Sequence, residues 1–165
     1  RSDRDHEIFP HLRKIDGRIS GEQILCGRGL VNLYEAICKA DGVDVLLKSP
    51  EEISDAALTQ RDAQAVEAVA LFCVYLARVA GDLALVYLAK GGVFLAGGIS
   101  QKILSAIRTS DFRLAFEDKS PHAELMRCIP TLVLTHPRAA LEGLLAFANA
   151  PQNYAVNEIA RRWQS

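Results

Sequence analysis

The chain has 165 residues, half of them hydrophobic, which is enough for about one domain with a sizeable core. Its 19 Lys and Arg residues nearly balance its 20 Asp and Glu residues, so the formal net charge is −1. No strong field would attract a nucleic acid or an anionic membrane surface, and we expect neither as a partner.

Helix signals dominate the first ninety residues. The patterns predict helices over residues 2–14, 30–40, 50–59 and 63–89. Ser2 would cap the first helix, and Pro10 should kink it or split it in two. Gly27-Arg28-Gly29 leads into the second. Ser49 and Pro50 open the third helix, as an N-cap followed by a proline at the first helical position.

The apolar segment 63–89 could be mistaken for a membrane span. Charged residues and a glycine interrupt it, so no uninterrupted stretch reaches the ~20 residues that a bilayer needs. A long buried helix fits better. Its polar edge would comprise Gln64, Glu67, Arg78 and Asp82, with Arg78 and Asp82 paired at i, i+4.

A glycine-framed apolar run follows the long helix. Residues 93–96 are apolar on both faces, which is typical of a strand buried in a sheet. Gly97 and Gly98 would then allow a sharp turn and close approach of a ligand, and Ser100 would cap a helix over 101–107. Free N–H groups at a helix start favour anions, so this turn could hold a nucleotide. The alternative is that the glycines only make a tight strand-to-helix turn.

The remaining pattern is again mainly helical. It predicts a second strand at 129–135, a helical turn near 121–126, and terminal helices over 138–150 and 152–163. Two or three strands are few for a complete α/β domain. The histidines have no metal-binding spacing, and the acidic patch of Asp111, Glu117 and Asp118 is more typical of a solvated helix face.

The four cysteines are Cys26, Cys38, Cys73 and Cys128. They lie far apart, mostly inside apolar runs, which fits neither a zinc site nor a disulfide framework. We expect free, mostly buried thiols in a reducing cytoplasm. The absence of a visible signal peptide agrees with this expectation, and Arg1 without a preceding Met indicates a fragment or a trimmed chain.

Several ordered motifs carry a resemblance to a known family. Residues 19–34 read ISGEQILCGRGLVNLY, which resembles the Ser-x-Glu segment and the Gly-x-Gly-Leu-Val-Asn-Leu-Tyr motif of bacterial-type glucokinases. Matching segments follow in the family's order at 71–73, Arg78, 82–85, 91–99 and 112–119. These glucokinases are ATP-dependent sugar kinases of the actin-like ATPase fold.

The resemblance implies an α/β fold of the actin-like (ribonuclease H-like) class, with residues 1–165 as a helix-rich C-terminal, large-domain portion. The family's Asp-x-Gly-Gly-Thr phosphate loop, its catalytic Asp and its Glu-Gly-Gly-His sugar motif are not found in this sequence. We therefore expect the chain alone to be inactive, and no catalytic residue carries over to it.

Three site residues do carry over from the resemblance. Glu22 would bind the sugar, because a carboxylate can accept two hydrogen bonds from adjacent hydroxyls of a pyranose ring; the alternative is a solvated surface Glu. Gly97 and Gly98 would form part of the adenosine-side wall of the nucleotide cleft. Gly27 and Gly29 would serve only to turn the chain. Two departures from the family's usual pattern are Cys26 in place of a Ser and Arg28 in place of a Pro, so any role for a hydroxyl at position 26 is in doubt.

The implied reaction is transfer of the ATP γ-phosphoryl group to the 6-hydroxyl of glucose, with Mg²⁺ on the phosphates, in a cytoplasmic homodimer. One alternative is a sugar-sensing transcription regulator of the related repressor and kinase superfamily. Such regulators usually add a helix-turn-helix, and the superfamily often carries a Cys-x-Cys-Gly zinc loop that this chain lacks. An actin-like assembly ATPase is a further alternative, against which Glu22 in its motif argues.

Overall fold

The computed structural model describes residues 3–154. Their helices and strands follow in the order α1 (Asp3–Ile8), η1 (Phe9–His11), η2 (Gly21–Gln23), α2 (Gly27–Asp41), α3 (Pro50–Leu58), α4 (Ala63–Val86), β1 (Val93–Leu95), α5 (Gly98–Lys102), α6 (Leu104–Thr109), α7 (Phe112–Glu117), α8 (Ala123–Arg127), β2 (Thr131–Val133), α9 (Ala139–Asn149) and η3 (Pro151–Asn153).

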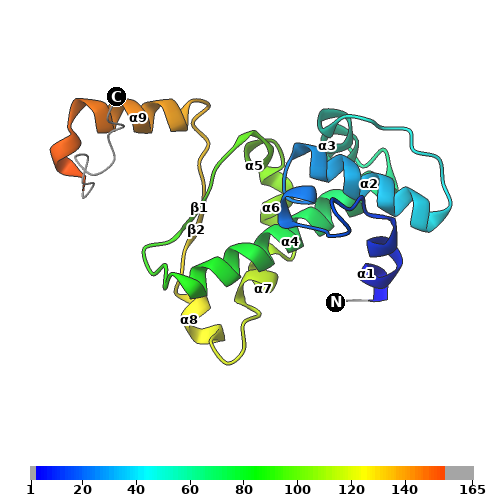
Figure 1. Cartoon of the computed structure of the whole chain (residues 1–165), viewed down its shortest axis with the longest axis horizontal. Helices are drawn as coiled ribbons and strands as arrows, with labels where there is room; N and C mark the ends of the chain where they lie inside the picture. The colour runs from blue at the N-terminus through cyan, green and yellow to red at the C-terminus, as the bar shows by residue number, and fades with distance from the viewer. Residues whose placement is uncertain (1–2, 155–165) are drawn as a thin grey trace.

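Helix α4 is the axis of the core, with α2 and α3 packed against one part of it and α7 against another (Figure 1). Small residues let these helices approach closely. A Cβ built at Gly81 would lie 2.7 Å from the Phe116 carbonyl oxygen of α7. Phe72 and Phe116 are both fully buried, so the crossing places apolar rings at the centre of the domain.

By length and composition alone α4 could cross a membrane, as the core helix of a globular domain also can. Its surroundings argue for a core helix. It packs against α2, α3, α6, α7 and α8, and its residues Ala65, Ala68, Cys73 and Ala77 are fully buried among them.

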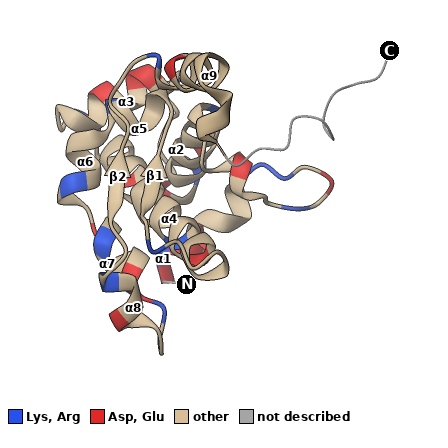
Figure 2. Ribbon diagram, turned by 90° about the vertical axis from the view of Figure 1, so that its left-hand side faces the viewer, with Lys and Arg blue, Asp and Glu red and all other residues tan. Residues whose placement is uncertain are grey.

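Strands β1 and β2 pair in parallel, with Val93 opposite Thr131 and Leu95 opposite Val133 (Figure 2). Leu95 faces the helices and is buried. The expectation that β1 is buried on both faces is wrong: Phe94 is 57% exposed, because no element of the described chain covers that side of the sheet.

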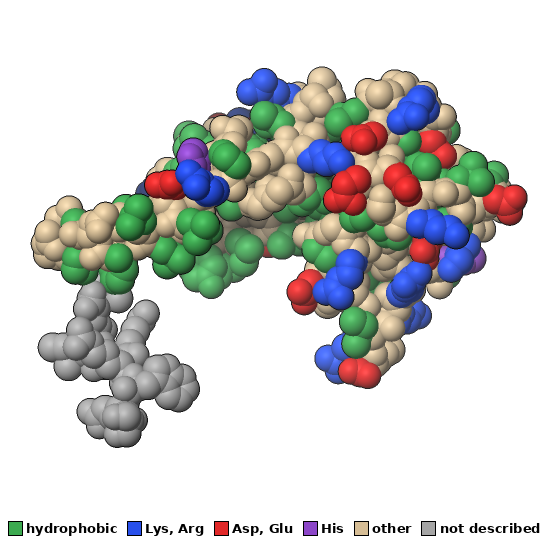
Figure 3. Space-filling view, turned by 90° about the horizontal axis from the view of Figure 1, so that it is seen from above, with side chains coloured by type: hydrophobic (Ala, Val, Ile, Leu, Met, Phe, Trp, Pro, Cys, Tyr) green, Lys and Arg blue, Asp and Glu red, His purple; other side chains and the backbone are tan. Residues whose placement is uncertain are grey.

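Helix α9 extends away from the core (Figure 1) and contains no buried residue. Leu141, Leu144 and Leu145 are each more than half exposed. Figure 3 shows hydrophobic side chains along the arm that carries α9, whereas most charged side chains gather over the rest of that face. The arm therefore presents an apolar surface without cover among the described residues.

Several element boundaries differ from the sequence predictions. Pro10 does split the first helix, into α1 and η1, whereas the predicted cap Ser2 and most of the predicted helix 152–163 lie outside the described residues. Helix α2 begins at Gly27, three residues earlier than predicted. Ser100 is not a cap: Gly97 is the N-cap of α5, and Ser100 is buried inside that helix.

The cysteines are free thiols in the described chain. Cys38 and Cys73 are buried as predicted, and burial raises the pKa of the Cys73 thiol to about 11. Cys128 is exposed, so the expectation of burial is wrong for it.

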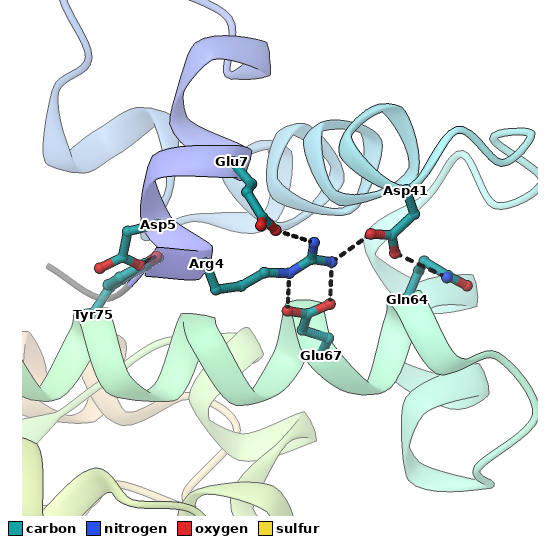
Figure 4. Close-up of polar contacts among 7 residues, drawn as sticks. All are labelled: Arg4, Asp5, Glu7, Asp41, Gln64, Glu67 and Tyr75. Atoms are coloured by element: carbon teal, nitrogen blue, oxygen red, sulfur yellow. Dashed lines mark hydrogen bonds and ion pairs between the residues drawn. The ribbon is translucent and has the colours of Figure 1, made fainter.

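The N-terminal helix is fixed to the core by Arg4 (Figure 4). Its guanidinium donates to both carboxylate oxygens of Glu67 on α4, at 2.7 and 2.8 Å, and to Asp41 at the end of α2, at 2.7 Å. Gln64 donates to the other oxygen of Asp41. These hydrogen bonds, from Gln64 and from Arg4, lower the pKa of Asp41. One cation thus ties α1, α2 and α4 together.

The next residue, Asp5, makes a second connection to α4. It is 2% exposed, accepts a hydrogen bond from the Tyr75 hydroxyl, and lies 3.8 Å from the Arg78 guanidinium. The predicted pair of Arg78 with Asp82 is therefore wrong. Asp82 instead pairs with Lys119, at 2.9 Å. Arg78 and Asp82 thus each have a partner from another segment of the chain rather than each other.

We predict that Arg4→Gln lowers the free energy of unfolding by about 1 to 2 kcal/mol, because it leaves three carboxylates, those of Glu67, Asp41 and Glu7, without their shared cation. Asp41 has a lowered pKa, so its contribution is present at neutral pH and is lost as the pH falls through that pKa. The difference between wild type and variant should thus shrink below about pH 4. Urea titrations at pH 7 and pH 3.5 measure both effects.

The control is Arg138→Gln. Arg138 is 71% exposed and makes one ion pair, 3.8 Å from Glu142, so its loss should cost less than about 0.5 kcal/mol. Equal losses for the two variants would contradict the role assigned to Arg4.

Candidate functional site

Glu22 lies in the short helix η2, directly before the start of α2. Its side chain is exposed, and among the described residues no hydrogen bond or ion pair engages its carboxylate. It lines a hollow of about 360 Å³ together with Cys26, Arg28 and Asn32. The carboxylate is thus available to accept hydrogen bonds from a polar ligand in this hollow.

Gly29 determines how closely η2 approaches α2. A Cβ built on it would lie 2.4 Å from the carbonyl carbon and 2.5 Å from the carbonyl oxygen of Ile24. Both atoms belong to the backbone, so no side-chain rotation could relieve the overlap. At Gly27 the nearest atom would be a Pro50 side-chain carbon at 3.4 Å, which is ordinary contact. Gly29 therefore permits close packing of backbone on backbone rather than only turning the chain.

Cys26 performs the capping role that a hydroxyl would perform. Its Sγ accepts a hydrogen bond from the Gly29 N–H at 3.3 Å, and the thiol donates to the Glu22 carbonyl oxygen at 2.9 Å. The thiol therefore joins the first turn of α2 to the backbone of Glu22 itself.

Gly97 and Gly98 follow the carboxyl end of β1, where ligands commonly bind in α/β folds. Gly97 has φ of +107°, a conformation that suits glycine. Gly98 begins α5 with open space where a Cβ would lie. It borders a second hollow, of about 490 Å³, which is also lined by Cys26, Gly27 and Lys102.

The two hollows adjoin at Cys26, which lines both. The structure thus brings Glu22 and Gly98, which are 76 positions apart, to two sides of the start of α2. Sequence reasoning missed Pro50 and Lys102. The Lys102 ammonium lies 3.5 Å from Asp55 on α3, which fixes α5 beside α3. No local signal marks that contact, because the two residues are far apart in the chain.

Within residues 3–154 no group of three or more His, Cys, Asp or Glu side chains is placed to hold a metal ion. The described side chains therefore offer no ready metal centre.

Comparison with known proteins decides the family. A family model described as Glucokinase matches residues 1–151. The chain belongs to the glucokinase family. It is 57% identical over 165 residues to the glucokinase of Agrobacterium fabrum, and 59% identical over 164 residues to that of Rhizobium leguminosarum bv. trifolii. These alignments cover 100% and 99% of this chain but 48% of each relative, so the chain spans about half the length of the curated relatives it matches.

A solved structure supports the same assignment. The crystal structure of a glucokinase from an Antarctic psychrotroph matches with a TM-score of 0.74 and 31% sequence identity, over 82% of this chain and 42% of that one. The expected fold class, a helix-rich portion of the α/β, actin-like glucokinase fold, is confirmed by this likeness.

We predict that Gly29→Ala in the full-length protein disturbs the Glu22 hollow, whereas Gly27→Ala does not. The added methyl at position 29 must push Ile24 away, so the variant should lose about 2 kcal/mol or more of stability. At position 27 the methyl meets only ordinary contact and should stabilise α2 or leave it unchanged. Thermal unfolding of both variants measures the difference, and equal melting temperatures would contradict the close contact.

Proposed function

We propose that this chain is the C-terminal, large-domain portion of an enzyme that transfers the γ-phosphoryl group of ATP to the 6-hydroxyl of glucose. The observation that carries the proposal is the junction of the two hollows at Cys26. Phosphoryl transfer needs the acceptor hydroxyl and the donor phosphate side by side, and two adjoining hollows meet that need.

Glu22 would hold the sugar in the first hollow. Its carboxylate is exposed and unengaged within the described chain, whereas its backbone is held by the Cys26 thiol and its helix packs on Gly29. A free acceptor on a fixed backbone suits the orientation of ring hydroxyls. The bond formed in the reaction joins the sugar O6 to the γ-phosphorus, the bond broken joins that phosphorus to ADP, and the hydroxyl proton leaves to a base that this chain does not supply.

Gly98 borders the second hollow and, together with Gly97 directly before it, would contact the adenosine part of ATP. The open space above Gly98 gives a flat ligand room to approach the backbone. The start of the 15-residue helix α2 lies beside this hollow, and the partial positive charge of a helix N-terminus favours the phosphate end of the same ligand.

The uncovered apolar surfaces support a longer protein. A two-stranded sheet with an exposed Phe94 and Leu132, and a helix α9 with three exposed leucines, are costly to leave in water. The remaining half of a glucokinase would pack against these apolar surfaces and bury them. We further propose cytoplasmic location and a homodimer for the full-length protein, with Mg²⁺ bound through the ATP phosphates.

The sharpest test is Glu22→Gln in the full-length enzyme. Loss of a charged acceptor for sugar hydroxyls should cost about 1.5 to 3 kcal/mol, which lowers kcat/KM for glucose roughly ten- to more than a hundredfold. The ATP KM and the melting temperature should stay nearly unchanged. A surface Glu would leave the kinetics within about twofold of wild type, and a structural one would lower the melting temperature first. As a control, the 165-residue chain alone should give no turnover in the same coupled assay.

Gly98→Val tests the nucleotide side. The protein itself has room for the new side chain, since nothing lies within 4 Å of the added Cβ, so folding should be preserved. A ligand that contacts this backbone would be obstructed, and the KM for ATP should rise at least tenfold with the glucose KM nearly constant. An unchanged ATP KM in a folded variant would mean that Gly97 and Gly98 only form a turn and do not contact ATP.

A further inference from the structure

The segment that carries Glu22 is held by two side-chain amides, those of Gln23 and Asn32. Gln23 follows Glu22 in η2. Its Oε1 accepts from the Ser20 N–H at 2.6 Å, and its Nε2 donates to the Arg13 carbonyl at 2.9 Å. Gln23 therefore ties both ends of the loop that leads from Arg13 to η2.

Asn32 completes this arrangement from α2. Its Oδ1 accepts from the Arg13 N–H at 2.9 Å, and its Nδ2 donates to the Gln23 carbonyl at 3.1 Å. The two amides and the Arg13 peptide groups thus form a closed ring of hydrogen bonds, which we call the amide clamp. Asn32 is 6% exposed and is one of few buried polar residues of the described chain. A buried amide with donor and acceptor both engaged fixes the parts that it joins.

We propose that Asn32 is a positioning residue for the sugar site, acting through Gln23 to hold Glu22 over its hollow. This inference rests on the proposed function. The clamp binds the residue after Glu22 by both its backbone and its side chain, whereas the Glu22 carboxylate stays unengaged. The sugar would then bind to a Glu22 whose backbone is already ordered. Binding therefore does not include the entropic cost of ordering that segment.

The location of Asn32 allows its positioning role to be distinguished from a contribution to overall stability. Asn32 does not line the second hollow, and its hydrogen-bond partners belong to the Arg13 loop and η2. Loss of the clamp should therefore weaken glucose use and leave ATP use unchanged. Tyr34 offers a matched control on the same helix. It is 1% exposed, and its hydroxyl donates to Asp62 at 3.1 Å, away from Glu22.

The experiment measures glucose and ATP kinetics and melting temperatures of Asn32→Leu, Asn32→Asp and Tyr34→Phe in the full-length enzyme. Leucine removes both clamp bonds at similar volume. Aspartate keeps the acceptor for Arg13 but turns an oxygen toward the Gln23 carbonyl. Both should raise the glucose KM at least fivefold with the ATP KM within twofold, whereas Tyr34→Phe should leave both constants within twofold. If neither Asn32 variant folds, Gln23→Glu, which loses only the bond to the Arg13 carbonyl, takes their place.

A double-mutant cycle separates positioning from a merely structural role. In a Glu22→Gln background the Asn32 substitution should add less than twofold to the glucose KM, because its effect passes through Glu22. A rise below fivefold in the single variants, or a full effect that persists without Glu22, overturns the inference. A wild-type enzyme that does not phosphorylate glucose overturns the proposed function, and this inference with it. Active wild type with unaffected variants overturns the inference alone.

Discussion

The contact between Gly29 and the backbone of Ile24 is the constraint on which the candidate site depends. A side chain at position 29 would overlap main-chain atoms by more than an ångström, at a distance of 2.4 Å. Its absence lets η2 lie directly on the first turn of α2. The Cys26 thiol can then span from the Gly29 N–H to the Glu22 carbonyl, and Asn32, one turn further along α2, can reach the Arg13 loop. The polar contacts around Glu22 are possible because two backbones touch.

The rest of the fold keeps α2 in place. Its inner face, which includes Leu30, Leu33 and Ile37, is fully buried against the core, and its far end is tied to α4 through Asp41 and Arg4. The Glu22 carboxylate, carried by η2, thus rests on a helix whose inner face and far end are both held by the core. Sites built on such supports hold their geometry better than sites on loops alone.

Local features of the fold could be predicted from the sequence, and contacts between distant segments could not. Ser49 does cap α3, with Pro50 at its first position, because capping depends on residues within one turn. The pairing of Arg78 was wrong because its partner, Asp5, lies 73 positions away on α1. Ser100 failed as a cap because the turn at Gly97 starts α5 earlier. Phe94 is exposed because no element of the described chain covers its face of the sheet, which no pattern within β1 reveals.

The candidate site shows the same division between what the sequence indicates locally and what depends on contacts between distant segments. The resemblance to the glucokinases indicates Glu22, Gly97 and Gly98, and the placement of Glu22 and Gly98 on adjoining hollows agrees with that resemblance without testing their roles. Asn32 and Gln23 carried no local signal of their own, since an Asn inside a helix and a Gln after a Glu are common on surfaces. Their role emerges only when three segments meet around the Arg13 peptide.

The shared position of Cys26 has a consequence for how the two hollows influence each other. A change that moves η2 relative to α2 should act mainly on the first hollow, because no residue of η2 itself lines the second one, which is lined by α2, α3, α5 and the connection before α2. A change that moves the start of α2 itself alters both hollows at once. Sugar and nucleotide binding should therefore be separable for substitutions in the amide clamp and inseparable for substitutions that displace the N-terminus of α2.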